Sequence, residues 1–351
     1  ASTQAPFSLR PQIARAIGLR PEDVRVITPY VGGGFGGKAA GGQAVEAARL
    51  ALVAGRPVMV AWTRAEEFMY DTFDPAAVVR IVSGVDAAGL LTLWDYQVYG
   101  AGGRATEVFY DVPNRRVRVY GEGPAGYHLF ATGPWRAPGA NMNRFAAEQQ
   151  IDAMARAAGI DPLEFRLRNT KDPRMLSVLR AVGQASGWQP SVAPSRTGRG
   201  RGLACGIDAG SYVAEVADVT VDRATGAVQV ERVVCAQEMG IVVNPEGAKM
   251  QMEGCITMGL GYALAEEVRF EGGRILDTNF DTYKLPRFSW VPRIETVLVP
   301  NDDLAPQGGG EPAIVTMGAV VANAIFDATG ARLLRSPMTP ERVLAELRRS
   351  G

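Results

Sequence analysis

The sequence is almost without histidine. His128 is the only one among 351 residues, so a zinc or non-haem iron site built from imidazoles is nearly excluded. A Ser-His-Asp triad could use only His128, and no Gly-x-Ser-x-Gly elbow accompanies it. The three cysteines, Cys205, Cys235 and Cys255, lie far apart and indicate neither a disulfide framework nor an iron–sulfur ligand set. Any redox chemistry must therefore come from a cofactor held by backbone and polar side chains.

The sequence also lacks an excess of charge and a long apolar run. Its 37 basic residues balance 37 acidic ones, which gives no electrostatic case for nucleic acid or an anionic membrane. Gly, Pro or charged residues interrupt every apolar stretch, and no signal peptide opens the sequence. We expect a cytoplasmic protein with a small-molecule substrate, no nucleic-acid partner and no membrane span, or a periplasmic one if a partner exports it. A start at Ala1 without Met is typical of a processed product or an excised domain.

Apolar periodicity predicts an α+β fold with mixed sheets, β-hairpins and packed helices. The turn sequences Asp86–Gly89 and Asp222–Gly226 each lie between two strand patterns and predict hairpins. Segment 187–202, rich in Gly, Pro, Ser and Arg, is the predicted linker between a first part, 1–186, and a second part, 203–351. The remaining predicted elements are helices 10–18, 42–54, 142–158 and 245–265, and strands 24–28 and 57–62.

A carboxylate near the C-terminus is the first candidate for catalysis. Residues 306–312 read Pro-Gln-Gly-Gly-Gly-Glu-Pro, followed by an apolar helical pattern. Glycines let the backbone approach a bound group, and Pro312 suits a first helical turn. Glu311 would lie at the mouth of a buried helix, where a carboxylate tends to have a raised pKa and can act as a base. A helix N-terminal acid that satisfies free amides is the competing interpretation.

A glycine-rich loop is the second candidate. The sequence Val31-Gly-Gly-Gly-Phe-Gly-Gly-Lys38 contains G-x-G-x-x-G between a predicted strand and a helix, which is typical of dinucleotide sites. The acid expected about twenty residues further on is absent, and Ala39 stands where a phosphate loop needs a hydroxyl. Backbone N–H groups packed against a rigid, bulky ligand are another interpretation, and a purely structural turn is a third.

Taken together, these residues resemble the molybdenum-binding large subunit of the xanthine dehydrogenase/aldehyde oxidase family, especially its isoquinoline 1-oxidoreductase and aldehyde dehydrogenase-like branch. The resemblance runs along nearly the whole chain in the family's order, as the C-terminal half of that subunit. The motifs that carry it are Ser2-Thr3-Gln4, Gly34-Phe35-Gly36, Trp135-Arg136-Ala137-Pro138-Gly139, Asp161–Asn169, Val243-Asn-Pro245 with Met250-Gln-Met-Glu-Gly254, and Gly309-Gly310-Glu311-Pro312.

The resemblance implies roles for single residues. It makes Glu311 the catalytic base and implies that two molybdopterin-binding parts flank the linker. It implies that Gln4 and the amides of Phe35 and Gly36 bind the metal's oxygen ligands. The other cofactor-binding residues that it implies are Gly34, Arg136, Gln251 and Gly310. Asp161–Asn169 is a family marker without catalytic chemistry.

Departures from the family pattern bear on substrate and partners. Ala39 and Pro138 stand where purine-oxidising members carry a substrate-binding Glu and a stacking Phe, and Arg116 is then expected to be structural. Xanthine is therefore not expected as the substrate. The family's pterin-gripping Gly-Gln-Gly segment is missing, which implies that a second polypeptide or a cleaved N-terminal part completes the site.

The resemblance implies a molybdenum hydroxylase that oxidises an aldehyde or N-heteroaromatic compound with water as the oxygen source. The cofactor would be molybdopterin with molybdenum, expected as the cytosine dinucleotide, without a protein ligand to the metal. Electrons would pass to iron–sulfur clusters in a small 2Fe–2S subunit and on to an FAD or cytochrome subunit. Two alternatives stay open here: a nicotinamide-dependent dehydrogenase that uses Gly32–Gly37, and a catalytically silent structural subunit of the same fold.

Overall fold

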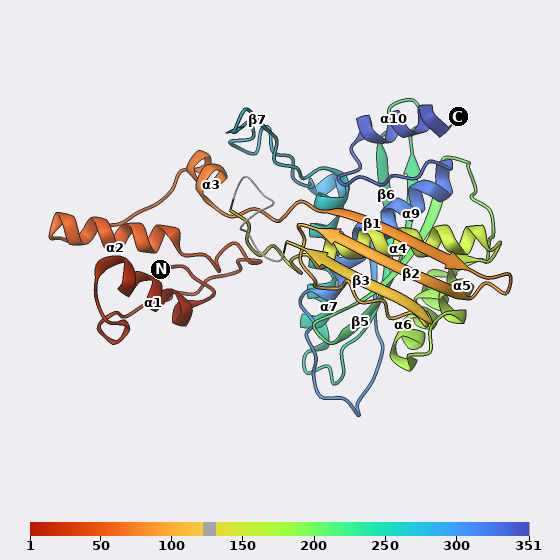
Figure 1. Cartoon of the computed structure of the whole chain (residues 1–351), viewed down its shortest axis with the longest axis horizontal. Coiled ribbons are helices and arrows are strands. Elements are labelled where there is room, and N and C mark those ends of the chain that lie inside the picture. Colours follow the sequence, from red (N-terminus) through yellow and green to blue (C-terminus); the bar gives the residue numbers. More distant parts are fainter. Residues whose placement is uncertain (122–130, 351) are drawn as a thin grey trace. The chain divides into compact units, whose positions relative to one another are not determined.

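The computed structural model describes residues 1–121 and 131–350, so His128 lies outside the described residues. The described chain forms two compact units. Unit 1 comprises residues 1–76, 123–138 and 268–283, and unit 2 comprises residues 77–122, 139–267 and 284–351. Figure 1 labels their elements.

Unit 1 is built mainly from helices and extended segments. Helices α1 and α2 pack against each other, and α3 begins with a capping box in which Thr63 and Glu66 satisfy each other's backbone N–H groups. A single parallel bridge joins Phe73 to Thr132. The elements of unit 1 are α1 (Pro6–Ile17), η1 (Pro21–Asp23), α2 (Gly42–Ala54), α3 (Arg64–Tyr70), β7 (Phe270–Glu271) and β8 (Arg274–Ile275).

Unit 2 contains two mixed sheets. The first has the order β1-β2-β3, with an antiparallel and then a parallel pair. The second has the order β4-β5-β6-β9, in which only the β6–β9 pair is parallel. The strands are β1 (Val78–Val85), β2 (Leu91–Tyr99), β3 (Asn114–Tyr120), β4 (Arg199–Asp208), β5 (Ser211–Val221), β6 (Val228–Glu238) and β9 (Arg293–Leu298).

One core joins both sheets of unit 2 to the helices between and around them. Helix α9 packs directly on two glycines of β4. A Cβ added at Gly200 would lie 2.2 Å from Ala324 O, and one added at Gly202 would lie 2.1 Å from Val320 O, so only glycine allows this close packing. The helices of unit 2 are α4 (Ala140–Ala157), α5 (Pro162–Arg168), α6 (Pro173–Ser186), α7 (Pro245–Leu264), η2 (Phe288–Trp290), α8 (Pro312–Val315), α9 (Met317–Thr329) and α10 (Pro340–Ser350).

The structure confirms the α+β fold with mixed sheets, and both hairpins form where the turn sequences predict them. Asp86 Oδ1 accepts the N–H groups of Ala88 and Leu90, while Gly89 has a φ of 77° that suits the turn. The predicted helix 42–54 has the same bounds in the structure, whereas α1 begins four residues earlier than expected. Residues 199–202 of the predicted linker open strand β4, and the division at 187–202 remains a proposal.

Two predicted strands, 24–28 and 57–62, do not form strands in the described part of the chain. Both segments lie in unit 1, and no strand among the described residues pairs with them. A strand pattern in the sequence needs a partner before it becomes a sheet.

The Asp161–Asn169 motif is structural. Asp161 accepts hydrogen bonds from the N–H groups of Leu163 and Glu164 and so caps α5. Arg166 forms a fully buried ion pair with Glu148 of α4, with Nε–Oε2 at 3.0 Å. Asn169 Oδ1 accepts the N–H of Leu91 at 2.8 Å and thereby attaches α5 to β2. The motif therefore anchors α5 to two neighbouring elements.

Among the described residues, one helical stretch, Pro312–Thr329, is long and apolar enough to cross a membrane. It is 89% buried inside unit 2, where α8 and α9 line the core. Burial of this kind is expected of a core helix.

Candidate cofactor-binding and catalytic site

Unit 1 brings three of the predicted motifs together around the glycine loop. Gln4 Oε1 accepts the N–H groups of Gly36 and Lys38, each at 3.2 Å. The N–H of Gln4 in turn donates to Lys38 O at 2.9 Å. Gln4 therefore holds both sides of the loop. The fit is close, since a Cβ at Gly34 would lie 2.3 Å from Gln4 Oε1.

The Arg136 loop closes the other side of the glycine loop. The Arg136 N–H donates to Phe35 O at 2.8 Å, and its guanidinium lies 5.4 Å from the centre of the Phe35 ring. Gly36 has a φ of 104°, and a Cβ there would lie 2.1 Å from Pro134 O. Only glycine fits this position, because its backbone conformation and its lack of a side chain are both needed.

The loop has the properties of a cradle for a polar, oxygen-rich group. Phe35 has a φ of 50° and its side chain is half exposed. A Cβ added at Gly32 would meet nothing within 4 Å, so the backbone is accessible at this point of the loop. The resemblance implies that the N–H groups of Phe35 and Gly36 both bind the metal's oxygen ligands. In this structure the Gly36 N–H already donates to Gln4 Oε1, so the two N–H groups are not equivalent.

Unit 2 brings together Glu311, Gly310 and Gln251. Glu311 is the N-cap residue of α8, but its side chain makes no capping hydrogen bond, contrary to the competing interpretation of this residue. A Cβ at Gly310 would lie 3.7 Å from Gln251 Oε1 of α7, and Cys255 of α7 donates through Sγ to Gly310 O at 3.3 Å. The segment that carries the carboxylate is thus fixed against α7.

An arginine that sequence reasoning missed holds the Glu311 carboxylate. Arg104 Nη2 lies 2.6 Å from Glu311 Oε2. The same guanidinium binds Asp208 at the end of β4, with Nε–Oδ1 at 2.8 Å and Nη2–Oδ2 at 2.7 Å. The Glu311 side chain keeps 36% exposure, so it is held in place without being sealed off. The local sequence does not mark Arg104, because the two residues that it binds lie 104 and 207 positions away.

The electrostatics of this cluster favour a charged arginine. Burial opposes the charge on Arg104, but hydrogen bonds to Asp208 and Glu311 outweigh it and raise the pKa of Arg104. Burial raises the pKa of Asp208 although Arg104 opposes this, and the nearby charge of Glu311 adds to the rise. Arg144 of α4 is a further cation that acts on Asp208. One guanidinium is therefore shared by two carboxylates.

A second buried carboxyl lies beneath the helices that follow Glu311. Glu215 of β5 is fully buried and accepts a hydrogen bond from Thr316 Oγ1 at 2.6 Å. Burial raises the pKa of Glu215 to about 8, so its neutral form predominates at pH 7. The buried thiol of Cys235 is a second polar neighbour of this carboxyl.

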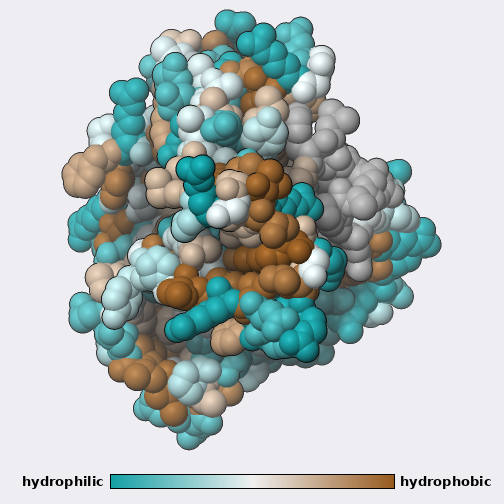
Figure 2. Space-filling model, turned by 90° about the vertical axis from the view of Figure 1, so that its left-hand side faces the viewer, coloured by the Kyte–Doolittle hydropathy of each residue, from teal (hydrophilic) through white to brown (hydrophobic). Residues whose placement is uncertain are grey.

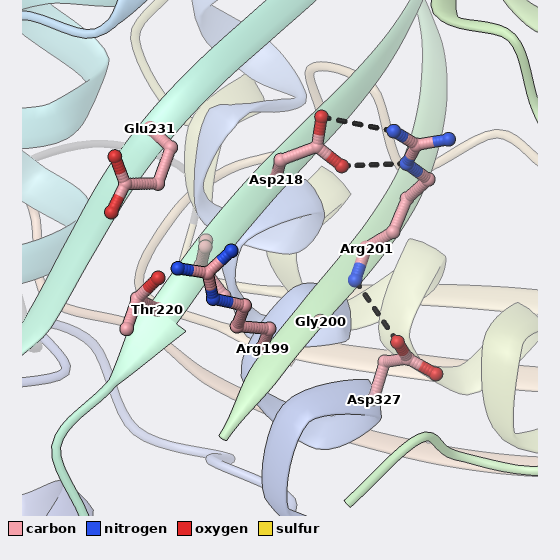
Figure 3. A pocket seen from close by; sticks show the side chains of 8 residues that line it. Arg199, Gly200, Arg201, Asp218, Thr220, Glu231 and Asp327 are labelled. Carbon is pink, nitrogen blue, oxygen red and sulfur yellow. Dashed lines mark hydrogen bonds and ion pairs between the residues drawn. The ribbon is translucent and has the colours of Figure 1, made fainter. Parts of the chain in front are cut away.

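A pocket elsewhere in unit 2 does not contain any of these residues. It has a volume of about 510 Å³ and is lined from β4, β5, β6 and α9. Figure 3 shows that Arg201 faces Asp218, which it binds through two nitrogens, while its backbone N–H donates to Asp327. Because these charges already satisfy each other within the sheet, we assign the pocket no role.

The fold does not favour the nicotinamide alternative. A dinucleotide fingerprint needs a glycine loop between a strand of a parallel sheet and a helix. Among the described residues of unit 1, parallel pairing is confined to the bridge between Phe73 and Thr132, and residues 24–28 before the loop are unpaired. Within the described residues, no group of three or more His, Cys, Asp or Glu side chains could hold a metal ion.

Comparison with known proteins finds two family models that match the chain in tandem. Both are described as molybdopterin cofactor-binding domains, the first matching residues 1–170 and the second residues 175–292. The chain is 32% identical to a nicotinate dehydrogenase subunit from Pseudomonas putida, over 99% of this chain and 32% of the relative. It is 31% identical to the beta subunit of isoquinoline 1-oxidoreductase from Brevundimonas diminuta, over 99% of this chain and 47% of the relative. The chain thus spans half the length of these relatives or less.

Solved structures share the fold. Quinoline 2-oxidoreductase from Pseudomonas putida 86 superposes with a TM-score of 0.86 at 16% identity. The match covers 100% of this chain and 72% of that protein.

Proposed function

Because this chain belongs to the xanthine dehydrogenase/aldehyde oxidase family and consists largely of molybdopterin cofactor-binding domains, we propose that it carries the catalytic base of a molybdenum hydroxylase. Its substrate would be an aldehyde or an N-heteroaromatic compound, with water as the oxygen source. The observation that carries the proposal is the Glu311 carboxylate, which Arg104 holds at 2.6 Å beside the Gly310 and Gln251 cluster.

Glu311 would act as the general base. Arg104 binds Oε2, so the direction of the carboxylate that would take the proton of the attacking oxygen is fixed. The partly exposed side chain can be reached by a reactant, whereas its position on α8 is fixed by Cys255 and the helix core. Orientation of this kind is a large part of what an active site contributes.

Arg104 would be a positioning residue for this base. Its charge stabilises the ionised carboxylate, which is the form able to accept a proton. Asp208 is buried and binds the guanidinium through both oxygens, so Arg104 has a fixed direction. Arg104 and Asp208 together therefore fix the direction in which the Glu311 carboxylate is held.

The cradle in unit 1 would hold the cofactor. When bound, the molybdenum–pterin group supplies two-electron oxidation and the activation of oxygen derived from water. Gln4, the accessible backbone of Gly34-Phe35-Gly36 and the Arg136 side chain would bind its polar atoms, and Gln251 with Gly310 would do the same in unit 2. Neutral amides and one cation suit an oxygen-rich, anionic group.

The form of the cofactor and the partners belong to the same proposal. We expect the cytosine dinucleotide form, which would release cytidine monophosphate on acid hydrolysis. A second polypeptide, or a cleaved N-terminal part, would supply the portion of the cofactor site that the longer relatives contain outside the region matched by this chain. The three cysteines are buried and dispersed, so a small 2Fe–2S subunit would receive the electrons, followed by an FAD or cytochrome subunit.

Two relatives support the substrate class, because their names contain N-heteroaromatic substrates, nicotinate and isoquinoline. Arg116 is a cross-strand partner of Asp95 in β2, in line with the expectation that it does not bind a purine.

The test is oxidation by the complex, purified through a tag on this chain, in water labelled with oxygen-18. Molybdenum and cytidine monophosphate should each be present at one per chain, and the acid or hydroxylated ring should carry the label. Product that is formed without the label, or a complex that contains a nicotinamide nucleotide instead of molybdenum, would overturn the proposal. A complex with the cofactor but no activity toward either substrate class would identify the silent structural subunit.

A further inference from the structure

Two segments of unit 1 have the character of β-strands but no partner. In residues 24–30 and 57–62 the half-buried side chains alternate with exposed ones, as in a strand with one covered face. Val24, Val26 and Thr28 are half-buried, whereas Arg25 and Ile27 are exposed. Val58, Val60 and Trp62 form the half-buried row of the second segment, and Met59 is 90% exposed.

The backbone of these segments is largely unsatisfied within the described residues. The carbonyl of Ile27 accepts the N-terminal amine at 2.9 Å, and no other backbone group in residues 25–30 or 57–62 has a hydrogen bond there. The Thr28 hydroxyl is buried and also has no partner among those residues. Strands that present free N–H and C=O groups are templates for pairing with another chain.

The helix next to these segments is also uncovered. Helix α2 is apolar, yet none of its residues is buried, and Leu50, Leu52 and Val53 are exposed by 45%, 66% and 87%. Figure 2 shows that hydrophobic residues gather in several places on one face of the molecule. Exposed apolar side chains grouped on one helix are typical of an interaction site.

We propose that residues 24–30 and 57–62 are edge strands completed by β-strand addition from the polypeptide that carries the part of the family's large subunit outside this chain. This identification of the partner rests on the proposed function. The relatives show how large that part is, because 99% of this chain accounts for only 32% and 47% of their lengths. The partner would contribute extended strands that pair through their main chain and an apolar surface that covers α2.

The pairing would act on the cofactor cradle. Residues 24–30 run directly into the glycine loop at Val31, whose carbonyl accepts Lys38 Nζ at 3.1 Å. A strand held by a partner fixes where this loop begins. Partner binding and cofactor retention are therefore coupled.

Hydrogen exchange measured by mass spectrometry tests the pairing directly. The amides of residues 25–28, 30 and 58–62 should exchange rapidly in the isolated chain, because they have no hydrogen bonds among the described residues. In the native complex, with the partner identified by its sequence, the same amides should be protected. Unchanged rapid exchange in a complex that contains molybdenum and is active would overturn the pairing and leave the proposed function intact.

Proline substitutions separate main-chain pairing from side-chain contact. Ile27→Pro and Met59→Pro each remove an N–H from an exposed position and should weaken the complex by about tenfold. Ile27→Val and Met59→Val keep the N–H and should bind almost as the wild type does. Val192→Pro, at an exposed position outside the two segments, should have no effect on binding and controls for folding.

Two further results would contradict the proposal. Protection of these amides in the isolated monomer would show that the segments pair within the chain. Protection that grows with concentration, together with the mass of a homodimer, would identify a second copy of this chain as the occupant.

Discussion

At the scale of single residues, two carboxyl groups of unit 2 have different surroundings. Glu311 shares an arginine with Asp208 and stays partly exposed, whereas Glu215 is fully buried and accepts a hydrogen bond from the Thr316 hydroxyl. Burial raises the pKa of Glu215 to about 8, so its neutral form predominates at pH 7. A neutral, buried carboxyl is poorly suited to accept a proton, whereas the Glu311 side chain can be reached by a reactant.

Replacing Arg104 should change the pH dependence of catalysis. In Arg104→Met the Glu311 carboxylate loses its cation, so the acid limb of kcat/KM should move to higher pH by about one unit or more. Arg104→Lys keeps the charge and should restore most of the profile. A pH profile measured on the complex checks this. If Arg104→Met lowered turnover without moving the acid limb, Arg104 would have a merely structural role.

Glu215 should make the protein less stable as the pH rises. Its folded pKa, about 8, lies above its ordinary value of 4.5, so its contribution is complete below about 4.5 and is lost as the pH rises through about 8. Each unit between the two values is worth about 1.4 kcal/mol. Urea unfolding from about pH 5 to pH 9 should therefore show a steeper loss of stability for the wild type than for Glu215→Gln. Asp74 in unit 1, whose pKa burial raises to about 7, contributes in the same direction in both proteins. Parallel curves for the two proteins would show that Glu215 does not titrate in this range.

The conformation of the glycine loop should be required for cofactor loading. Gly36→Val would place a branched side chain against Pro134 O, where even a Cβ would be 2.1 Å away. We expect the complex to lose molybdenum, measured per chain. The matched control is Gly32→Ala, which has a φ of 72° but open space, and should retain most of the metal. Normal metal and activity in Gly36→Val would make the loop a purely structural turn.

At the scale of elements, the sequence predicts those that are complete within local stretches of the chain. The Asp86–Gly89 and Asp222–Gly226 turns carry their own hydrogen-bonding side chains and define two hairpins. Helix α2 is predicted with its observed bounds. The predicted strands 24–28 and 57–62 do not form in the part of the chain that the structure describes. Strand pairing depends on a partner strand, which the periodicity of one segment does not reveal.

The candidate site is predictable in part for the same reason. Glu311, Gln4 and the glycine loop stand out by their local sequence. Arg104 and Asp208 do not, because 104 residues separate them and only folding brings the guanidinium to both carboxylates. Long-range ion pairs of this kind have no local pattern.

Helix α5 depends on a buried ion pair. Arg166→Met would leave the Glu148 carboxylate fully buried without its cation, which typically costs about 3–5 kcal/mol. Adding Glu148→Gln removes the uncompensated charge but keeps a partner for Tyr110 and Cys205, and should recover part of the loss. Thermal unfolding of both variants measures this. If Arg166→Met alone were as stable as the wild type, the ion pair between Arg166 and Glu148 would contribute nothing to holding α5.

At the scale of the whole molecule, unit 1 carries the cradle formed by Gln4, Gly34–Gly36 and Arg136, and unit 2 carries Glu311, Gly310 and Gln251. Each cluster is organised by its own contacts. Unit 1 has an uncovered apolar helix and two segments without a strand partner among the described residues, and the chain covers 32% and 47% of two relatives. These features accord with the proposed assembly.

The central claim, that Glu311 is the base of a molybdenum hydroxylase, is tested most directly by Glu311→Gln in the complete complex, with molybdenum content and turnover measured on the same sample. The substitution keeps the shape of the side chain and removes its ability to accept a proton. We predict wild-type molybdenum content and a fall in turnover of about a hundred- to ten-thousand-fold, the usual contribution of an acid–base group. Turnover within a few-fold of wild type in a fully metallated Glu311→Gln complex would contradict the account.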